Sequence, residues 1–353
     1  MKAINSLFKT YRKHFDQHHQ PIVMRSQVCL IRNFLEFKFS DFATDDEKRK
    51  ILNFAKICTR KLKNFKTSFD LTALTPAERL ALQEYEMIGK KLLTNHAWSE
   101  VICGSKVRAA VTINGGDHLR ICVIHSGLQL KKSLEKASTI DDEIDGGDYA
   151  FLPDIGYLTS RPCSLGTGMR AAVFMHLPGL VLTEQIQYLT NAVQQIGIGI
   201  NNVYGDSSRI LGHVFKISNQ QTLGIKESEE IRRLGDVVKT VMEQENMART
   251  SFLEQNRILF RDRIGRMYGV LCSCYTLTSD DALEILSWMR FAVDLGIFDV
   301  KYRPGIDRLM VEIQPGNLAL RCDQILTEEE QDRKRAIIVH TFFKQMGEPR
   351  FTD

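Results

Sequence analysis

The stretch TINGGDHLRICV, Thr112–Val123, joins two apolar runs through four small or polar residues. Asn114, Gly115, Gly116 and Asp117 tolerate the backbone angles of a tight reversal, and apolar runs on both sides are typical of paired strands. The stretch therefore predicts a β-hairpin and an antiparallel sheet. It also raises the question whether this turn is only a turn, or a reaction site whose side chains are missing.

Similar short apolar runs continue from residue 101 to about residue 224, separated by Gly and Asp. They predict strands with interspersed helices, including one helix over LVLTEQIQYLTNAVQQIG that ends at Gly197. The segment 45–95 has a mostly helical pattern, with a helix start at Thr75 and Pro76.

After residue 224 the pattern becomes helical again. Apolar residues recur at heptad a and d spacing, interrupted by Glu245: Ile231, Leu234, Val238, Val241, Ala248 and Phe252. Two or three heptads fit a coiled coil or a helix with one buried stripe, and the second interpretation is favoured.

The composition is that of a globular protein, with 43% hydrophobic and 25% charged residues among 353. A net charge of +4 without a clustered basic stripe argues against a nucleic-acid partner. No apolar run approaches the length of a membrane span, and the N-terminus lacks the apolar core of a signal peptide. The eight cysteines are scattered, which favours reduced thiols, a cytoplasmic location and no zinc site. His14 and His18 are four apart but lack a nearby carboxylate or cysteine, so a solvated helix face is favoured over a metal site.

Longer motifs are more specific. There is no P-loop, and SLGTGMR alone is a weak anion-binding signal. However, GYLTSRPCSLGTGMRAAVFMHLPGL (156–180) and VYGDSSRILGHVFKISNQQTLG (203–224) closely resemble consecutive signature blocks of the phosphagen kinase, or ATP:guanido phosphotransferase, superfamily. GGDHLRI (115–121) resembles its N-E-E-D-H-L-R-I block, and VMRSQVCLIRNF (23–34) its S-S-R-I-R-L-A-R-N block. The helical C-terminal part, with DLGI, IQPG and QDRKRA, most resembles the bacterial protein arginine kinase branch.

The resemblance implies an α+β fold in which helices flank an antiparallel, glutamine-synthetase-like sheet. It implies an N-terminal helical arm over 1–20, a phosphagen-kinase-like catalytic domain over 21–225 and a helical domain over 226–353. By resemblance, the last domain mediates formation of a homodimer.

The family transfers the γ-phosphoryl group of ATP to a guanidinium group. Mg²⁺ and fixed cations must neutralise the transferring group, and Arg suits this role through its forked donors. The acceptor is itself cationic, so carboxylates must align it. By resemblance this chemistry uses about five Arg residues, two Glu residues and a nearby Cys.

On the phosphate side, the resemblance retains Arg120 and Arg170. The two Arg residues of the S-R-I-R block are Gln27 and Cys29 here, and that of the R-G-x-Y-G-E block is Asn201. Arg25 can share a strand face with Gln27, but it would be displaced by roughly 7 Å along the strand. A misplacement of about 1 Å already costs on the order of 10²-fold in rate.

The acceptor side is altered as well. Gly115 and Gly116 replace the two adjacent Glu residues, and Asp206 replaces another Glu with a shorter arm. Arg161 stands at the Cys position, which puts a cation where the family receives a cationic guanidinium; Cys163 can share its face. The opening stretch thus resembles an acceptor loop without its carboxylates.

Bacterial arginine kinases also carry an R-D-x-x-R-A motif that binds phosphoarginine away from the active site. Here it reads QDRKRA, so Gln331 replaces the first Arg while Asp332 and Arg335 remain. A reshaped phosphoarginine site and an exposed charged helix are both open, and the second is favoured.

Three functional hypotheses follow. The first is a protein arginine kinase homologue with little or no activity, a regulator or scaffold in protein quality control under stress. The resemblance alone implies its partners, a small zinc-binding activator protein and the Clp protease system. The second is an active ATP-dependent kinase with Arg25, Arg120, Arg161, Arg170 and Asp206 in a rearranged site. The third is a phosphoarginine-binding module.

Overall fold

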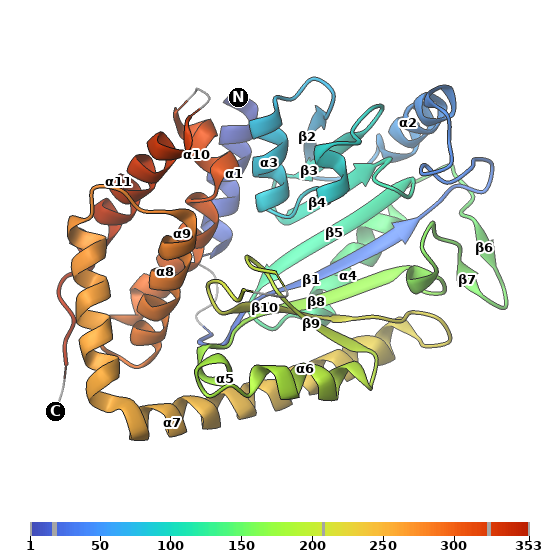
Figure 1. Ribbon diagram of the computed structural model, residues 1–353. Helices are drawn as coiled ribbons and strands as arrows, with labels where there is room; N and C mark the ends of the chain where they lie inside the picture. The colour runs from blue at the N-terminus through green and yellow to red at the C-terminus, as the bar shows by residue number, and fades with distance from the viewer. Residues whose placement is uncertain (1, 16–19, 207–208, 323–325, 352–353) are drawn as a thin grey trace. The chain divides into compact units, whose positions relative to one another are not determined.

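The computed structural model describes residues 2–15, 20–206, 209–322 and 326–351. Its central element is an eight-stranded sheet with the strand order β2-β3-β4-β5-β1-β8-β10-β9 (Figure 1). Its strands are β1 (Val23–Arg32), β2 (Phe65–Asp70), β3 (Glu100–Gly104), β4 (Arg108–Ile113), β5 (Leu119–Ser126), β8 (Met169–His176), β9 (Ile198–Asn202) and β10 (Val214–Asn219). The strands β6 (Phe151–Leu152) and β7 (Gly156–Tyr157) form a separate pair.

The predicted hairpin is present. Strands β4 and β5 pair antiparallel, with Thr112 opposite Arg120 and Ile113 opposite Leu119. Strand β5 also pairs antiparallel with β1, which places Ile31 opposite Arg120. The α+β class with an antiparallel sheet is therefore confirmed, and three neighbouring strands present a common face in known register.

Helices α1 (Lys2–Phe15), α2 (Asp45–Thr59), α3 (Pro76–Glu84) and α4 (Leu130–Asp142) belong to the N-terminal half of the chain. Thr75 caps α3 through a reciprocal capping box with Glu78, which confirms the predicted helix start. The prediction of a mostly helical 45–95 is wrong for Phe65–Asp70, which is strand β2. Pairing with β3 overrides the local propensity there, and Phe69 is buried.

The C-terminal half contains α5 (Pro178–Leu182), α6 (Ile186–Gln194), α7 (Glu227–Ser273), α8 (Ser279–Asp294), α9 (Arg303–Glu312), α10 (Pro315–Cys322) and α11 (Glu328–Met346). The single helix predicted over 180–197 is two helices, because Glu184 adopts a left-handed φ of 58° between them. In α7 the apolar stripe is buried from Ile231 to Ala248, as expected of a helix with one buried face. Glu245 in this stripe is also fully buried.

The chain forms two compact units. The first comprises Met1–His14, Arg25–Val173 and Ser218–Asp236, and the second comprises Phe15–Met24, Phe174–Ile217 and Val237–Asp353. Short 3-10 helices, η1 (Lys90–Leu93), η2 (Pro162–Ser164) and η3 (Val300–Tyr302), link larger elements within them. Within the described ranges, no helix is both long and apolar enough to cross a membrane.

Candidate functional site

The NGGD turn is tightly built. Asn114 has a φ of 59° and Gly116 a φ of 118°, and Asn114 N–H donates to the His118 carbonyl at 3.1 Å. The Asn114 side chain accepts from Ser40 Oγ at 2.8 Å and donates to the carbonyls of Lys48 and Trp98. These contacts, rather than glycine alone, fix the turn where the family has its acceptor carboxylates.

A carboxylate from another segment lies beside this turn. A Cβ placed on Gly116 would lie 3.8 Å from both Asp41 carboxylate oxygens and 4.0 Å from Lys91 Nζ. Asp41 and Lys91 form an ion pair. An ion pair of opposite charges thus lies next to Gly116. Sequence reasoning did not identify it because Asp41 is distant in the chain.

The turn is bonded to the segment that carries Arg161. Asp117 accepts hydrogen bonds from Ser160 N at 2.6 Å and Ser160 Oγ at 2.9 Å, and from Asn33 Nδ2 at 2.8 Å. Gly116 directly precedes Asp117 in the chain, and Arg161 directly follows Ser160. The structure therefore brings the two altered acceptor motifs together, with the Arg161 side chain exposed.

The glycine-rich segment that ends in Arg170 packs closely on β1. A Cβ on Gly168, whose φ is 62°, would lie 2.6 Å from the Ile31 carbonyl oxygen. In return, Ile31 N–H donates a hydrogen bond of 2.8 Å to the Gly168 carbonyl. Arg170 follows on β8 and donates weakly to the carbonyls of Gln220 at 3.4 Å and Cys163 at 3.5 Å.

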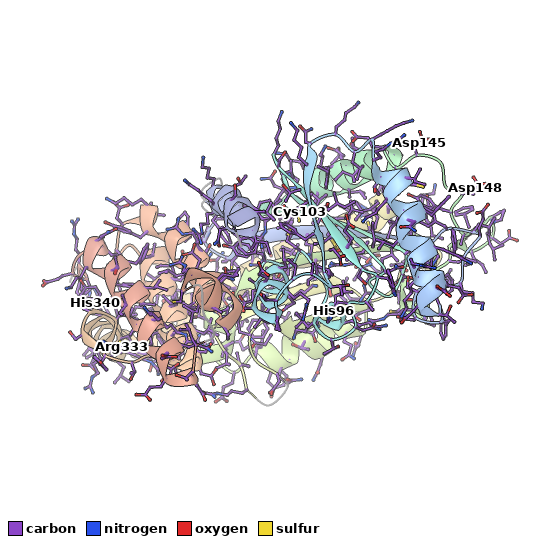
Figure 2. All side chains as sticks on the ribbon, turned by 90° about the horizontal axis from the view of Figure 1, so that it is seen from above. His96, Cys103, Asp145, Asp148, Arg333 and His340 are labelled. Atoms are coloured by element: carbon purple, nitrogen blue, oxygen red, sulfur yellow. A yellow bond between two sulfur atoms is a disulfide. The ribbon has the colours of Figure 1, made fainter. Side chains whose placement is uncertain are left out.

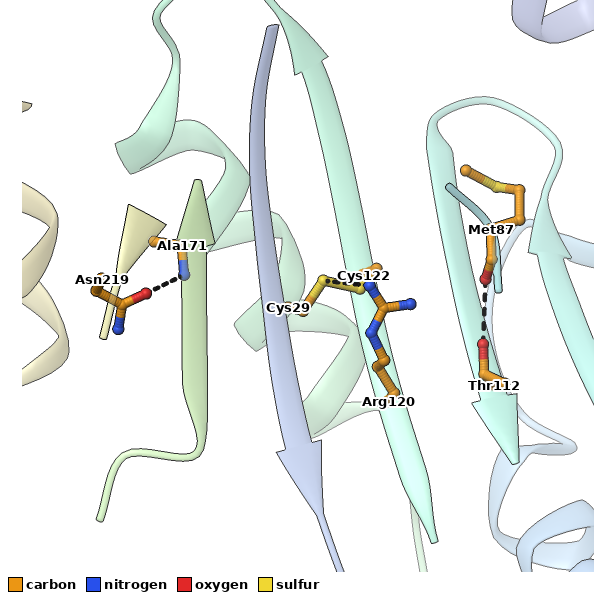
Figure 3. Close-up of a disulfide and its surroundings, with 7 residues drawn as sticks. All are labelled: Cys29, Met87, Thr112, Arg120, Cys122, Ala171 and Asn219. Carbon is orange, nitrogen blue, oxygen red and sulfur yellow. Dashed lines mark hydrogen bonds between the residues drawn. A yellow bond between two sulfur atoms is a disulfide. The ribbon is translucent and has the colours of Figure 1, made fainter. Parts of the chain in front are cut away.

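Arg25, Gln27 and Cys29 alternate along β1, and Arg120 lies on the neighbouring strand β5. Arg120 Nη2 contacts Cys29 Sγ at 3.3 Å, so these side chains share one face of the sheet (Figure 3). Burial lowers the pKa of the Arg120 guanidinium. We call Arg25, Arg120 and Arg108, the last on β4, the cation face.

Cys29 forms a disulfide with Cys122, directly opposite on β5 (Figure 3). The expectation of reduced cysteines is wrong for this pair, because the non-local pairing of β1 with β5 brings the two side chains together. A disulfide thus stands at one of the two β1 positions for which the resemblance predicts the loss of a phosphate-binding Arg. Cys163, by contrast, is a free and exposed thiol.

Arg25 does not point freely into the site, because its Nη2 forms an ion pair of 2.7 Å with Glu86 Oε1. Burial, and next the charge of Arg25, lower the pKa of Arg108 to about 10. Sequence reasoning missed both Glu86 and Arg108. The alternation of Arg108 with the apolar residues of β4 was the signal available for Arg108.

The two remaining residues that were predicted for the kinase site, Asn201 and Asp206, lie in the second unit. Asn201 is exposed at β9, and Asp206 is exposed in the loop that follows, where its Oδ1 accepts from Arg209 N at 3.0 Å. Asn202 organises this loop by donating to the carbonyls of Leu211 and Val214, both at 3.1 Å. Asp206 is thus an exposed carboxylate on a loop, and its role as an acceptor carboxylate stays a prediction.

The QDRKRA segment lies on α11. Arg335 is buried, donates to the carbonyls of Leu277 at 2.7 Å and Ile313 at 3.1 Å, and forms an ion pair with Asp332. Gln331 Nε2 donates to the Leu326 carbonyl at 3.2 Å. The guanidinium carbon of Arg333, which is labelled in Figure 2, lies 5.1 Å from the centre of the Tyr275 ring. Arg335 therefore connects α11 to neighbouring segments, and phosphoarginine binding by Gln331, Asp332 and Arg335 stays a prediction.

The second unit also contains a buried ion network, consisting of Glu245, Arg249, Arg290, Asp294, Arg303 and Asp307. Asp294 accepts from Arg303 Nε at 2.6 Å and Arg249 Nη1 at 3.0 Å. Beside it, His176 and His213 both contact Ser287 Oγ at 2.8 Å. Burial lowers the pKa of His213 to about 4. No sequence motif indicated this network, since its members come in pairs from three helices, α7, α8 and α9.

No group of three or more His, Cys, Asp or Glu side chains suited to a metal ion occurs in the part of the chain that the structure describes. His18 and His19 lie outside the described residues, and the His14 side chain is not described either.

Solved structures define the class of fold. Lombricine kinase matches with a TM-score of 0.56 and 21% identity, over 65% of this chain and 68% of that chain. The substrate-free duplicated taurocyamine kinase from Schistosoma mansoni matches with a TM-score of 0.56 and 18% identity, over 79% of this chain and 40% of that chain. The fold is therefore that of the phosphagen kinases.

Sequence comparisons are more specific. Residues 49–248 match the family "ATP:guanido phosphotransferase, C-terminal catalytic domain", and residues 257–353 match "Protein-arginine kinase McsB C-terminal domain". Protein-arginine kinase of Geobacillus stearothermophilus is 35% identical over 90% of this chain and 89% of its own length. That of Halalkalibacterium halodurans is 36% identical over 92% of each. The chain belongs to the bacterial protein-arginine kinase family.

Proposed function

We propose that this chain is a protein-arginine kinase family member with little or no phosphoryl-transfer activity, which acts in protein quality control as a regulator or scaffold. The observation that carries the proposal is the acceptor turn, in which Gly115 and Gly116 provide no carboxylate and the neighbouring Arg161 adds a cation. A cationic acceptor needs carboxylates for alignment and proton removal.

The phosphate side supports the same proposal. Gln27 and Cys29 provide no cation, Cys29 is in a disulfide, and Arg25 is paired with Glu86. Removing one preorganised charge-stabilising donor typically costs about 10²–10³-fold in turnover, and losses within one site are not additive. Several simultaneous losses therefore leave little of the family's rate enhancement. ATP and Mg²⁺ remain the family's co-substrates, and the paired state of Arg25 does not fit tight binding of a triphosphate.

One observation favours an active kinase with a rearranged site. Asp41 brings a carboxylate next to Gly116, where it can replace a missing Glu if Lys91 releases it. Arg120 and Arg170 would then serve the phosphates.

A transfer assay distinguishes these functions. The purified full-length protein is incubated with ATP–Mg²⁺ and an arginine-rich protein, and acid-labile phosphate is read by mass spectrometry. The proposal expects no transfer from protein shown to be folded. Transfer that is lost in both Asp206→Ala and Asp41→Asn would establish the rearranged kinase instead.

The partners are part of the proposal and are tested separately. A homodimer in the cytoplasm, a small zinc-binding activator protein and the Clp protease system are proposed from membership of the family. Sedimentation at micromolar concentration tests the dimer, and a monomer there contradicts it. Binding of phosphoarginine that is unchanged in Arg335→Ala would remove the third hypothesis.

A further inference from the structure

The cation face is built by three neighbouring strands in fixed register. Gln27 and Arg108 both stand opposite Ile124, one on each side of β5, so their rows are adjacent. Side chains opposite one another in antiparallel strands lie on the same side of the sheet, and so do alternate residues of one strand. Arg25, Gln27, Arg108 and Arg120 therefore share a face. The other face of β5 is turned to α4, where His125 contacts Ser133 Oγ at 2.9 Å.

Glu86 reaches this face from the connection that follows α3. Its backbone has a left-handed φ of 62°, which non-glycine residues rarely adopt. The conformation is held by hydrogen bonds from Glu86 N to Gln83 O at 2.8 Å and from Met87 N to Leu82 O at 2.9 Å. Thr112 Oγ1 on β4 donates to Met87 O at 3.1 Å (Figure 3). These contacts fix the backbone of the connection beside the sheet, and the Glu86 carboxylate itself is held by Arg25.

This carboxylate serves more than one cation. Beyond its 2.7 Å ion pair with Arg25, the charge of Glu86 raises the pKa of both Arg108 and Arg120 against the lowering caused by their burial. Glu86 thus pairs with Arg25, and its charge also acts on the guanidinium groups of Arg108 and Arg120, while Arg108 Nη2 donates to the Tyr85 carbonyl at 2.8 Å. A multiply charged anion with several acceptor oxygens would compensate them more completely than a single carboxylate.

Two further donors on the same face are left over. Gln27 is 3% exposed, yet its Nε2 has no hydrogen-bond partner among the described residues. Arg120 Nη1 is also buried without a partner in the described part of the chain. Buried donors without acceptors are rare in folded proteins and costly, so their presence beside three cations indicates a ligand rich in acceptor oxygens.

We propose that Glu86 is an internal anion that closes a binding site for a phosphate chain, formed by Arg25, Gln27, Arg108 and Arg120. Glu86 and the ligand compete for the same cations, so the site binds phosphate only when Glu86 is displaced. The inference builds on the proposed function, because it explains why the phosphate side is closed, but it concerns anion binding and requires no transfer. Binding and transfer are measured in different experiments, so one can fail without the other.

The test is a titration of the full-length protein with inorganic tripolyphosphate, by calorimetry and by thermal shift. If the Glu86 carboxylate closes the site in about nine of ten molecules, it weakens the apparent affinity for the anion about 10-fold. Glu86→Gln removes this carboxylate. The variant is therefore expected to bind tripolyphosphate at least about 10-fold more tightly than the wild type. Glu135→Gln is the matched control, because it removes one negative charge from an exposed position on α4. A folded Glu86→Gln that binds no more tightly than the wild type overturns the proposal, and so does an equal gain in Glu135→Gln.

Two further arms locate the site and protect the test against misfolding. Glu86→Asp keeps the negative charge but shortens the side chain by one methylene. A smaller gain in affinity for tripolyphosphate is therefore expected. If this folded variant shows no gain in affinity, the proposal is overturned. Adding Arg120→Gln to Glu86→Gln is expected to abolish the gain, and a gain that survives places the anion elsewhere and overturns the assignment. ATP should show the same gain as tripolyphosphate, whereas a gain for ATP alone contradicts recognition of the phosphate chain.

Discussion

Two buried groups of charges in this protein are built differently. In the buried ion network, three Arg residues are matched by three carboxylates, and Asp294 alone accepts from Arg249 and Arg303 at 3.0 and 2.6 Å. On the cation face, Glu86 forms an ion pair with Arg25, and donors of Gln27 and Arg120 stay without an acceptor among the described residues. Complete pairing is the pattern of a structural core. Incomplete pairing marks a surface shaped for a ligand, even where that surface is now closed.

The largest effect is expected from breaking the complete network. Asp294→Asn keeps the shape of the side chain but leaves buried Arg residues without their counter-charge, which costs about 3–5 kcal/mol of the free energy of unfolding. Urea denaturation followed by circular dichroism measures this loss. Asp262→Asn, which affects an exposed pair with Arg266, should stay within about 0.5 kcal/mol. Equal losses in the two variants would remove the distinction drawn between the groups.

The disulfide tests the cation face of the comparison, because it joins β1 and β5 on that same face of the sheet. Cys29 and Cys122 are 93 residues apart, and a cross-link of that span typically contributes about 2–4 kcal/mol to stability. The free energy of unfolding should therefore fall when dithiothreitol is added. The Cys29→Ser/Cys122→Ser double variant should not respond to dithiothreitol, and a response there would assign the effect to other thiols.

Acidification should loosen the second unit. The folded-state pKa of His213 is about 4, below the ordinary value of 6.5 in an unfolded chain. Between pH 6.5 and 4 the imidazole of His213 is therefore protonated in the unfolded chain but neutral in the folded protein. The stability that is present above pH 6.5 is lost as the pH falls toward 4. We expect a loss of about 1–2 kcal/mol between pH 6.5 and 5. Asparagine tolerates the local φ of 47°, so His213→Asn is a suitable control. In this variant the free energy of unfolding should fall less steeply with decreasing pH. An unchanged pH dependence would exclude His213 as its origin.

The smallest effect is expected at the acceptor turn. Gly116→Ala places a side chain at a φ of 118° and should cost about 1–2 kcal/mol, although the space itself is sufficient. Gly235→Ala, inside α7 with open space around it, should instead gain about 0.5–1 kcal/mol. Thermal unfolding of the two variants gives the comparison. A neutral Gly116→Ala would mean that the turn rearranges readily and that a Glu could return there.

The sequence was sufficient for the fold class, because ordered motifs and alternating apolar runs both point to an antiparallel sheet with helices. From the sequence we also predicted an altered acceptor turn, and the hydrogen bonds from Ser160 to Asp117 hold the segments of the two motifs side by side. The short-range signals were reliable where a cap or turn decides the outcome, as at Thr75.

Long-range pairing limited the rest. The disulfide could not be predicted, because it depends on β1 lying beside β5 across the intervening strands. Glu86 looked like the ordinary end of a helix, and only the three-dimensional register shows that it faces Arg25. The break at Glu184 was missed since the flanking residues keep a helical pattern, while one residue adopts a left-handed conformation.

The place of β1 in the sheet has a consequence for synthesis on the ribosome. This strand is made early but lies between β5 and β8, whose residues are translated much later. At about 5–20 residues per second, the 93 residues between Cys29 and Cys122 take on the order of 5–20 s to translate. During that interval the nascent chain carries an apolar strand without its partners, which makes β1 a natural target for chaperones that bind emerging polypeptides.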